Sequence, residues 1–247
     1  MAARTAPNDS TNIFANIGRA FSSLDDKLEK RQKTHLKNVY GSLAVGLGSA
    51  AVGASVHLFT NILRANFLLS LGSIALMFML MSTPAVPENQ KKRFGYFLGF
   101  CFISGVSTGP LLEHAMMINP TIILTAFLTT AFVFTCFSLS ALYAPSTKYL
   151  YLGGTLASAS MALLFMAIFT RYYTVMMWMG LGISCAFILY DTQLIVEKNR
   201  MGDEDYIWHS VELFIDFIQV FRYLVVLLSQ KEEKRENNRR RNERSAY

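Results

Sequence analysis

Charged residues are scarce in this sequence. Lys, Arg, Asp and Glu make up 16% of the 247 residues, whereas hydrophobic residues make up 52%. A soluble domain carries closer to about a quarter of charged residues. The composition therefore excludes an ordinary soluble enzyme or binding domain, and it favours a chain whose surface lies in a membrane.

Cysteine and histidine are also rare. The three cysteines, Cys101, Cys136 and Cys185, each lie in an apolar segment. An odd count at such positions excludes a disulfide framework and is typical of small packing residues. The four histidines are scattered and no HExxH motif occurs, which argues against a zinc hydrolase.

Long apolar segments are what the sequence does contain. Segments of about twenty residues cross a hydrocarbon layer of about 30 Å at about 1.5 Å per residue. The expected spans are 37–59, 62–82, 94–114, 120–142, 149–169, 174–196 and 206–228. We therefore predict an all-α polytopic membrane protein with seven hydrophobic helices, the last of them semi-polar and central.

Three regions follow from this pattern. Residues 1–36 are expected to form a cytosolic tail, residues 37–228 the helical bundle, and residues 229–247 a basic cytosolic tail.

Two local features stand out within the bundle. Small residues recur at four-residue intervals in the first span and predict a close approach of another helix; they are Ser42, Gly46, Ala50 and Ala54. The pair 109–110, Gly-Pro, is expected to kink or break the third span.

The orientation follows from the distribution of Lys and Arg. The segment up to residue 37 contains seven of them, and alternate loops are richer in basic residues, so the N-terminus is expected in the cytosol. Residues 231–247 contain seven Lys and Arg against four Glu. The last span either re-enters, leaving this tail cytosolic, or crosses while shielded inside the bundle. Charge favours the first solution, in which both termini are cytosolic. The tail is then expected to be either solvated and largely disordered or attracted to anionic lipid, and not to bind nucleic acid.

The last span carries a polar stripe. At 100° per residue, one stripe about 80° wide contains His209, Glu212, Asp216, Gln219 and Tyr223. Ionisable residues at membrane depth face the bundle interior or a watery cavity. The stripe therefore predicts a central helix in which His209, Glu212 and Gln219 belong to a candidate cation path.

Asp191 and Asp216 are carboxylates in apolar surroundings. Asp191 alone is explained by hydration near the interface or by bonding to 192–193, and Asp216 by pairing with Arg222 or with a hydroxyl group in the bundle. If the two carboxyl groups meet, they cannot both ionise cheaply and share a proton. Such a pair would form a proton-sensitive latch whose charged form attracts a cation, and its oxygen atoms suit Ca²⁺.

A second acidic group follows the sixth span. Asp203, Glu204 and Asp205 form a short turn on the side expected to be cytosolic. They are interpreted either as an acidic mouth that collects cations or as an ordinary solvated loop. We expect no fixed metal site and no cofactor, with Ca²⁺ and H⁺ as transported or sensed ions.

Two stretches at the C-terminal end carry a resemblance. FILYDTQLIVEK at 187–198 and GDEDYIWHSVELFIDFIQVFR at 202–222 resemble the C-terminal signature of the Bax inhibitor family. The stretch 109–144 is similar to the third and fourth spans of that family. The resemblance covers roughly residues 35–228.

The resemblance implies a seven-helix fold with the last helix at the centre, and no enzymatic activity. It further implies a multi-pass endoplasmic-reticulum protein that leaks Ca²⁺ in a pH-dependent way. Such a protein suppresses apoptosis and ER stress, partly with anti-apoptotic Bcl-2-type partners. The family's aspartate dyad corresponds to Asp191 and Asp216.

Three other classes remain open. Residues 105–109, GVSTG, match the G-x-S-x-G pattern of hydrolases, which needs a strand–turn–helix elbow. A proton-coupled cation antiporter would also use intramembrane carboxylates, although no internal repeat is visible. In a non-conducting scaffold, which could be oligomeric, the aspartates would only hold the bundle, and function would lie in binding Bcl-2-type partners.

Overall fold

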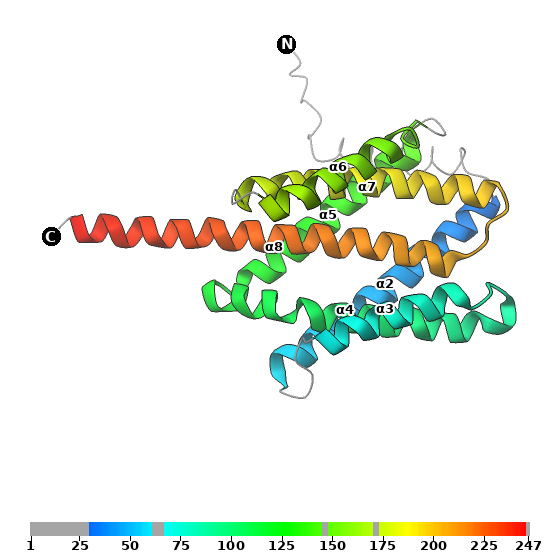
Figure 1. Cartoon of the computed structure of the whole chain (residues 1–247), viewed down its shortest axis with the longest axis horizontal. Coiled ribbons are helices and arrows are strands. Elements are labelled where there is room, and N and C mark those ends of the chain that lie inside the picture. Colours follow the sequence, from blue (N-terminus) through cyan, green and yellow to red (C-terminus); the bar gives the residue numbers. More distant parts are fainter. Residues whose placement is uncertain (1–29, 61–66, 145–147, 170–172, 246–247) are drawn as a thin grey trace, which may run out of the picture.

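The described part of the chain is built from helices. The computed structural model describes residues 30–60, 67–144, 148–169 and 173–245 (Figure 1). Its helices are α2 (Lys30–Phe59), α3 (Phe67–Ser82), the 3₁₀ turn η1 (Pro87–Asn89), α4 (Gln90–Ile118), α5 (Thr121–Tyr143), α6 (Leu152–Phe169), α7 (Tyr173–Arg200) and α8 (Tyr206–Ser245). These seven α-helices, without a strand in the described ranges, confirm the all-α prediction. Most of the predicted N-terminal tail, residues 1–29, lies outside the described residues.

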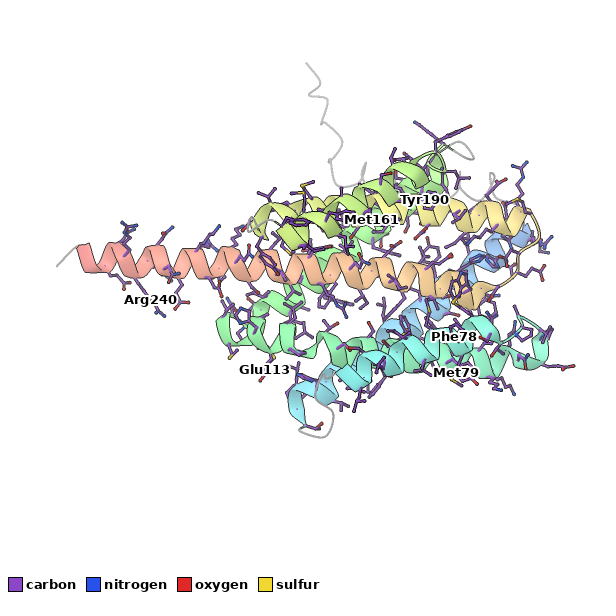
Figure 2. The ribbon with its side chains drawn as sticks, viewed as in Figure 1. Phe78, Met79, Glu113, Met161, Tyr190 and Arg240 are labelled. Atoms are coloured by element: carbon purple, nitrogen blue, oxygen red, sulfur yellow. The ribbon has the colours of Figure 1, made fainter. Side chains whose placement is uncertain are left out.

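Most of these helices suit a bilayer. Five are long and apolar enough to cross one: α2, η1 with α4, α5, α6 and α7, while α3 is a shorter apolar helix. Large apolar side chains point outward from the bundle, among them Phe78 and Met161, which are 70% and 55% exposed (Figure 2). An outward apolar surface of this kind is stable only against lipid. The chain is therefore a multi-pass membrane protein.

Four of the helices, α2, α4, α7 and α8, are longer than the apolar segments that predict them. For example, α4 runs from Gln90 to Ile118 and passes Pro110 without interruption, so of the two predicted effects at 109–110, a kink or a break, the break is wrong. Neighbouring helices and local adjustments compensate the hydrogen bond that a proline removes inside a membrane bundle. The additional turns include polar stretches such as 30–35 and 90–93, which a hydropathy pattern does not mark.

The last helix lies at the centre of the bundle. α8 packs against α2, α4, α5 and α7, whereas α3 packs on α4 and α6 on α7. Leu213, Phe214 and Val220 of α8 are fully buried. Because four helices surround it, α8 tolerates polar residues that would be costly against lipid. This arrangement confirms the predicted central position.

α8 does not end at residue 228 as predicted. It continues as one 40-residue helix to Ser245, about 60 Å in length, and its last part projects beyond the bundle (Figure 1). No Gly or Pro follows Gly202, and the tail is rich in helix-forming Glu, Lys and Arg. Arg240 pairs with Glu236 at 2.5 Å, one turn away. Local propensity thus extends the helix where no packing supports it.

The two ends of the described chain lie at opposite ends of the bundle (Figure 1). At the end where α8 begins, Arg93 of α4 bonds Asp205. At the other end, Thr174 of α7 donates to Gln230 (3.3 Å). Since α8 runs from one end of the bundle to the other as one continuous helix, the re-entrant solution, in which the segment turns back, is wrong.

This course of α8 makes a topological prediction. Tags placed at the two termini are expected on opposite sides of the membrane. In sealed vesicles, a protease should remove one tag and reach the other only after the membrane is permeabilised. Simultaneous digestion of both tags in intact vesicles would contradict the course of α8 described here.

The stripe of small residues on α2 packs against α4, as predicted. Ser42, Gly46 and Ala50 are buried. A Cβ atom at Gly105 of α4 would collide with the carbonyl of Ala50, and one at Gly53 with the carbonyl of Phe102. The two backbones are therefore in direct contact, which fixes α4 relative to α2.

Candidate functional site

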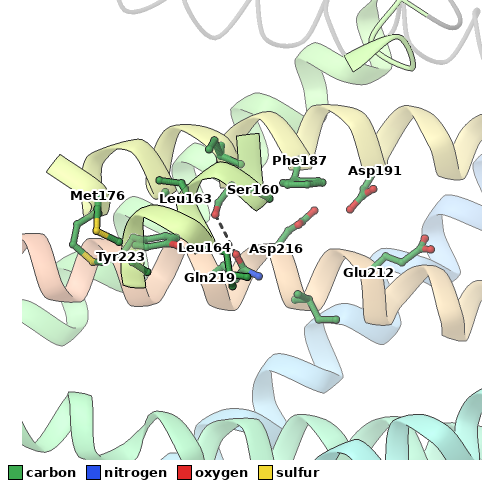
Figure 3. Close-up of a pocket in the computed structure, with 16 residues that line it drawn as sticks. Ser160, Leu163, Leu164, Met176, Phe187, Asp191, Glu212, Asp216, Gln219 and Tyr223 are labelled. Atoms are coloured by element: carbon green, nitrogen blue, oxygen red, sulfur yellow. Dashed lines mark hydrogen bonds between the residues drawn. The ribbon is translucent and has the colours of Figure 1, made fainter. Parts of the chain in front are cut away.

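A cavity of about 590 Å³ lies between α6, α7 and α8 (Figure 3). Its lining includes Asp191 from α7 and Glu212, Asp216, Gln219 and Tyr223 from α8. These four residues of α8 belong to the predicted polar stripe. The structure thus brings most of the stripe together with Asp191 around one cavity.

Asp191 and Asp216 face each other in this cavity (Figure 3). Both side chains line the same cavity; Asp216 is only 7% exposed, and Asp191 is half-buried. They meet because α7 and α8 run antiparallel in contact with each other and each turns its aspartate toward the other helix. A low-dielectric contact of this kind disfavours two negative charges, so a proton or another cation between them is favoured.

Arg222 does not neutralise Asp216. It follows Asp216 by six residues, which places it about 240° further around the helix. Its guanidinium donates to the Thr108 hydroxyl from Nε (3.0 Å) and Nη2 (2.7 Å), and to the carbonyl of Ser104 (3.3 Å). The pairing of Asp216 with Arg222 is therefore wrong, and the arginine instead binds α8 to α4.

Gln193, one of the local partners suggested for Asp191, has another role. The side chain of Gln193 accepts from the backbone N–H of Tyr149 (2.7 Å) and donates to the carbonyl of Ala141 (3.2 Å). It thus joins α7 to the end of α5. Asp191 is left facing the cavity and Asp216.

Glu212 sits at one end of the cavity and is already partly neutralised. Its Oε1 accepts from the Lys198 ammonium (2.9 Å) and from the Trp208 indole N–H (2.8 Å). The Glu212 and Lys198 side chains are 20% and 27% exposed. The pair connects the end of α7 to the start of α8 and lies close to the two aspartates.

His209, the remaining member of the stripe, does not line this cavity. It is fully buried, and its Nδ1 lies 2.8 Å from Nε2 of His35 on α2. Its Nε2 lies 3.6 Å from a carboxylate oxygen of Asp203. Sequence reasoning missed His35, because the two histidines are 174 residues apart and only the packing of α2 on α8 brings them together.

The acidic turn is neutralised by basic partners. Glu204 bonds Arg31 at 2.8 Å, and Asp205 receives two bonds from Arg93, of 2.7 and 2.5 Å. Asp203 faces His209, and all three acids line a separate cavity of about 840 Å³ that shares no lining residue with the first. The turn is thus not the mouth of the aspartate cavity. It joins α2 and α4 to α8.

The remaining chemical motifs have no catalytic geometry. The GVSTG sequence lies within the continuous helix α4, so it lacks the strand–turn–helix elbow that the hydrolase motif requires. Within the described ranges, no group of three or more His, Cys, Asp or Glu residues is arranged to hold a metal ion. The aspartate cavity is the site in which two carboxyl groups from different helices face each other.

Fold and site define a class: helical multi-pass membrane proteins with a carboxylate pair between two helices inside the bundle. A family model described as "Inhibitor of apoptosis-promoting Bax1" matches residues 32–233. The match includes the bundle and both aspartates. The chain belongs to this family, the Bax inhibitor family.

Individual relatives agree with this assignment. Bax inhibitor 1 of Rattus norvegicus is 48% identical over 205 residues, which are 80% of this chain and 86% of the relative. The Homo sapiens protein of that name is 47% identical over 204 residues, with the same coverage. Bax inhibitor 1 of Oryza sativa is 39% identical over 240 residues, covering 94% of this chain and 95% of the relative.

Proposed function

We propose that this protein is a membrane suppressor of apoptosis and ER stress that acts as a pH-sensitive Ca²⁺ leak channel. The observation that carries the proposal is that Asp191 and Asp216 face each other in one cavity inside the bundle. In this proposal the pair shares a proton in one state and attracts a cation in the other. Family membership supports the role in apoptosis.

The path for the cation is proposed along the cavity. Glu212 and Gln219 line it on either side of Asp216. Carboxylate and amide oxygens are ligands that Ca²⁺ accepts, and a path without a fixed site allows release as well as entry. His209 is not part of this path, because it faces His35 outside the cavity.

The cellular setting is also part of the proposal. We place the protein in the endoplasmic-reticulum membrane with its N-terminus in the cytosol. The bias of Lys and Arg toward the N-terminal flank and alternate loops supports this orientation. The projecting end of α8 then lies on the opposite side. Anti-apoptotic Bcl-2-type proteins are proposed partners, in keeping with the names of the relatives, and the protein is proposed to be non-enzymatic.

The experiment is a Ca²⁺ efflux assay with purified protein in sealed lipid vesicles. We expect the leak to depend on pH, and Asp216→Asn to reduce it about tenfold and remove the pH dependence. A charge-assisted interaction of about 1.5–3 kcal/mol corresponds to at least that factor. The amide keeps the shape of the side chain but does not titrate.

Glu197→Gln is the matched control. Glu197 lies on the same helix as Asp191, faces Arg200 at 3.8 Å and does not line the cavity. Its substitution should leave both rate and pH dependence unchanged. Absence of flux at every pH would instead favour a scaffold, and saturable exchange of Ca²⁺ for protons would favour an antiporter.

A further inference from the structure

The aspartate cavity has two chemically different ends. Asp191 and Glu212 lie toward one end, whereas Met176 and Tyr223 lie at the other (Figure 3). The lining near the second end also includes Leu164 and Ala167 of α6 and Met177 of α7. From Glu212 to Tyr223 the cavity follows eleven residues of α8, about 16 Å. It is therefore elongated, acidic at one end and mostly apolar along its remaining length, where the polar lining residues are Ser160, Ser184, Gln219 and Tyr223.

The acidic end has unused hydrogen-bonding capacity. Oδ2 of Asp216 is buried, and no described side chain other than Asp191 is positioned to bond it. Oε2 of Glu212 is likewise buried without a hydrogen-bond donor among the described residues. Buried carboxylate oxygens without donors are costly, so a cationic donor placed between them is stabilised.

The cavity also opens to the outside between α6 and α8. α6 packs on α7 and leaves part of α8 uncovered. Gln219 is exposed although it lies in the middle of α8, and Leu164 on the facing helix is 61% exposed. Both residues line the cavity. In a bilayer, this side of the bundle faces lipid, so the opening is accessible to molecules dissolved in the membrane.

A fixed metal site does not account for these features. The described residues contain no cluster of three or more acidic, histidine or cysteine ligands for one. Glu212 is moreover engaged by Lys198 through its other oxygen. An ammonium group, in contrast, donates up to three hydrogen bonds and needs no fixed coordination geometry. The apolar length of the cavity suits an alkyl chain attached to it.

We propose that the cavity binds a single-chain amphiphilic amine that enters from the bilayer. Its ammonium group donates to Asp216 and Asp191, and its alkyl chain lies along the α6–α7 wall toward Met176. A bound amine would occupy the cation position between the two carboxylates and block it. The inference shares the aspartate pair with the proposed channel but requires no conduction, so binding is measured without flux and the two proposals can fail separately.

The test uses n-dodecylamine and a cysteine in the cavity. Ser160→Cys is introduced on the α6 wall in a full-length chain whose three native cysteines are replaced by serine, and alkylation by N-ethylmaleimide is timed in lipid vesicles. We expect n-dodecylamine to slow the alkylation about tenfold at saturation. At equal membrane concentration, n-dodecanol and dodecanoate should not protect, because one lacks the charge and the other carries the opposite charge.

Two substitutions examine the acidic end. Asp216→Asn should raise the amine concentration needed for protection about tenfold or more, the equivalent of losing one charge-assisted hydrogen bond. Glu197→Gln should leave it unchanged, since Glu197 lies outside the cavity. Equal protection by dodecanol, or unchanged protection in Asp216→Asn, would overturn the proposal, because the carboxylates would then play no part in binding.

Ala167→Trp tests the apolar end and keeps the carboxylates intact. The indole fills the region near Ala167, so the variant should prefer n-octylamine over n-dodecylamine, whereas the parent prefers the longer chain. This readout does not depend on the stability of an Asp216 variant. An unchanged chain-length preference shows that the alkyl chain does not lie along α6, and it overturns the assigned position.

Discussion

Replacing Arg93 with Met is expected to lower the free energy of unfolding by about 3–5 kcal/mol, the usual cost of removing one partner of a buried ion pair. Arg93 is only 4% exposed and donates two hydrogen bonds to Asp205, whose side chain is 17% exposed. Asp205 also accepts from the backbone N–H of Trp208 in the first turn of α8 (3.1 Å). Without the arginine, the ion pair between α4 and the start of α8 is lost, and the half-buried carboxylate of Asp205 has no cationic partner.

The measurement is unfolding of the purified protein in detergent, by heat or by a denaturing detergent. Arg31→Met is the matched control, because Arg31 pairs with the neighbouring Glu204 but the two side chains are 53% and 72% exposed. Its effect should not exceed about 1 kcal/mol. The double variant with Asp205→Asn should recover part of the loss. Equal effects of the Arg93 and Arg31 substitutions would contradict the structural role of the buried pair.

A single methyl group at Gly105 is expected to destabilise the bundle by about 1–3 kcal/mol or more, as overpacking does. The added Cβ of Gly105→Ala would collide with the backbone carbonyl of Ala50, which belongs to a helix and cannot move aside like a side chain. The expected result is separation of α2 from α4 and a lower unfolding midpoint. Trapping of α2–α4 contact by engineered cysteines should weaken in parallel.

Gly95→Ala provides the control on the same helix. A Cβ at Gly95 meets nothing within 4 Å, and alanine is the better helix former. Its unfolding midpoint should therefore be unchanged or slightly higher. If both substitutions behave alike, the contact between the α2 and α4 backbones is looser than described.

Local patterns in the sequence predict most of the fold. The apolar segments mark the helices, and the stripe on residues 206–228 identifies α8 as the helix that must be buried. Helical periodicity also places Asp216, Gln219 and Tyr223 on one face, and these residues line one cavity. These inferences succeed because they depend only on neighbours within a few turns.

The errors concern contacts between distant segments. The side of α8 that Arg222 occupies follows from periodicity, but its partner Thr108 lies 114 residues away. Arg93 and Asp205 are likewise far apart in the sequence. Their ion pair makes the acidic turn a contact between α4 and the start of α8 instead of a cation-collecting mouth. The end of α8 differs from the prediction for another reason. Hydropathy sets the predicted limit at residue 228, whereas the helix continues because the charged tail has high helix propensity.

The continuity of α8 has a mechanical consequence. From Tyr206 to Ser245 the helix has neither glycine nor proline, so it contains no joint that could absorb a rotation. A twist applied to the projecting segment near Arg240 reaches Asp216 as a twist of the same sense, while Asp191 stays with α7. The projecting end of α8 thus forms one rigid helix with the segment that carries Asp216, one of the two facing carboxyl groups.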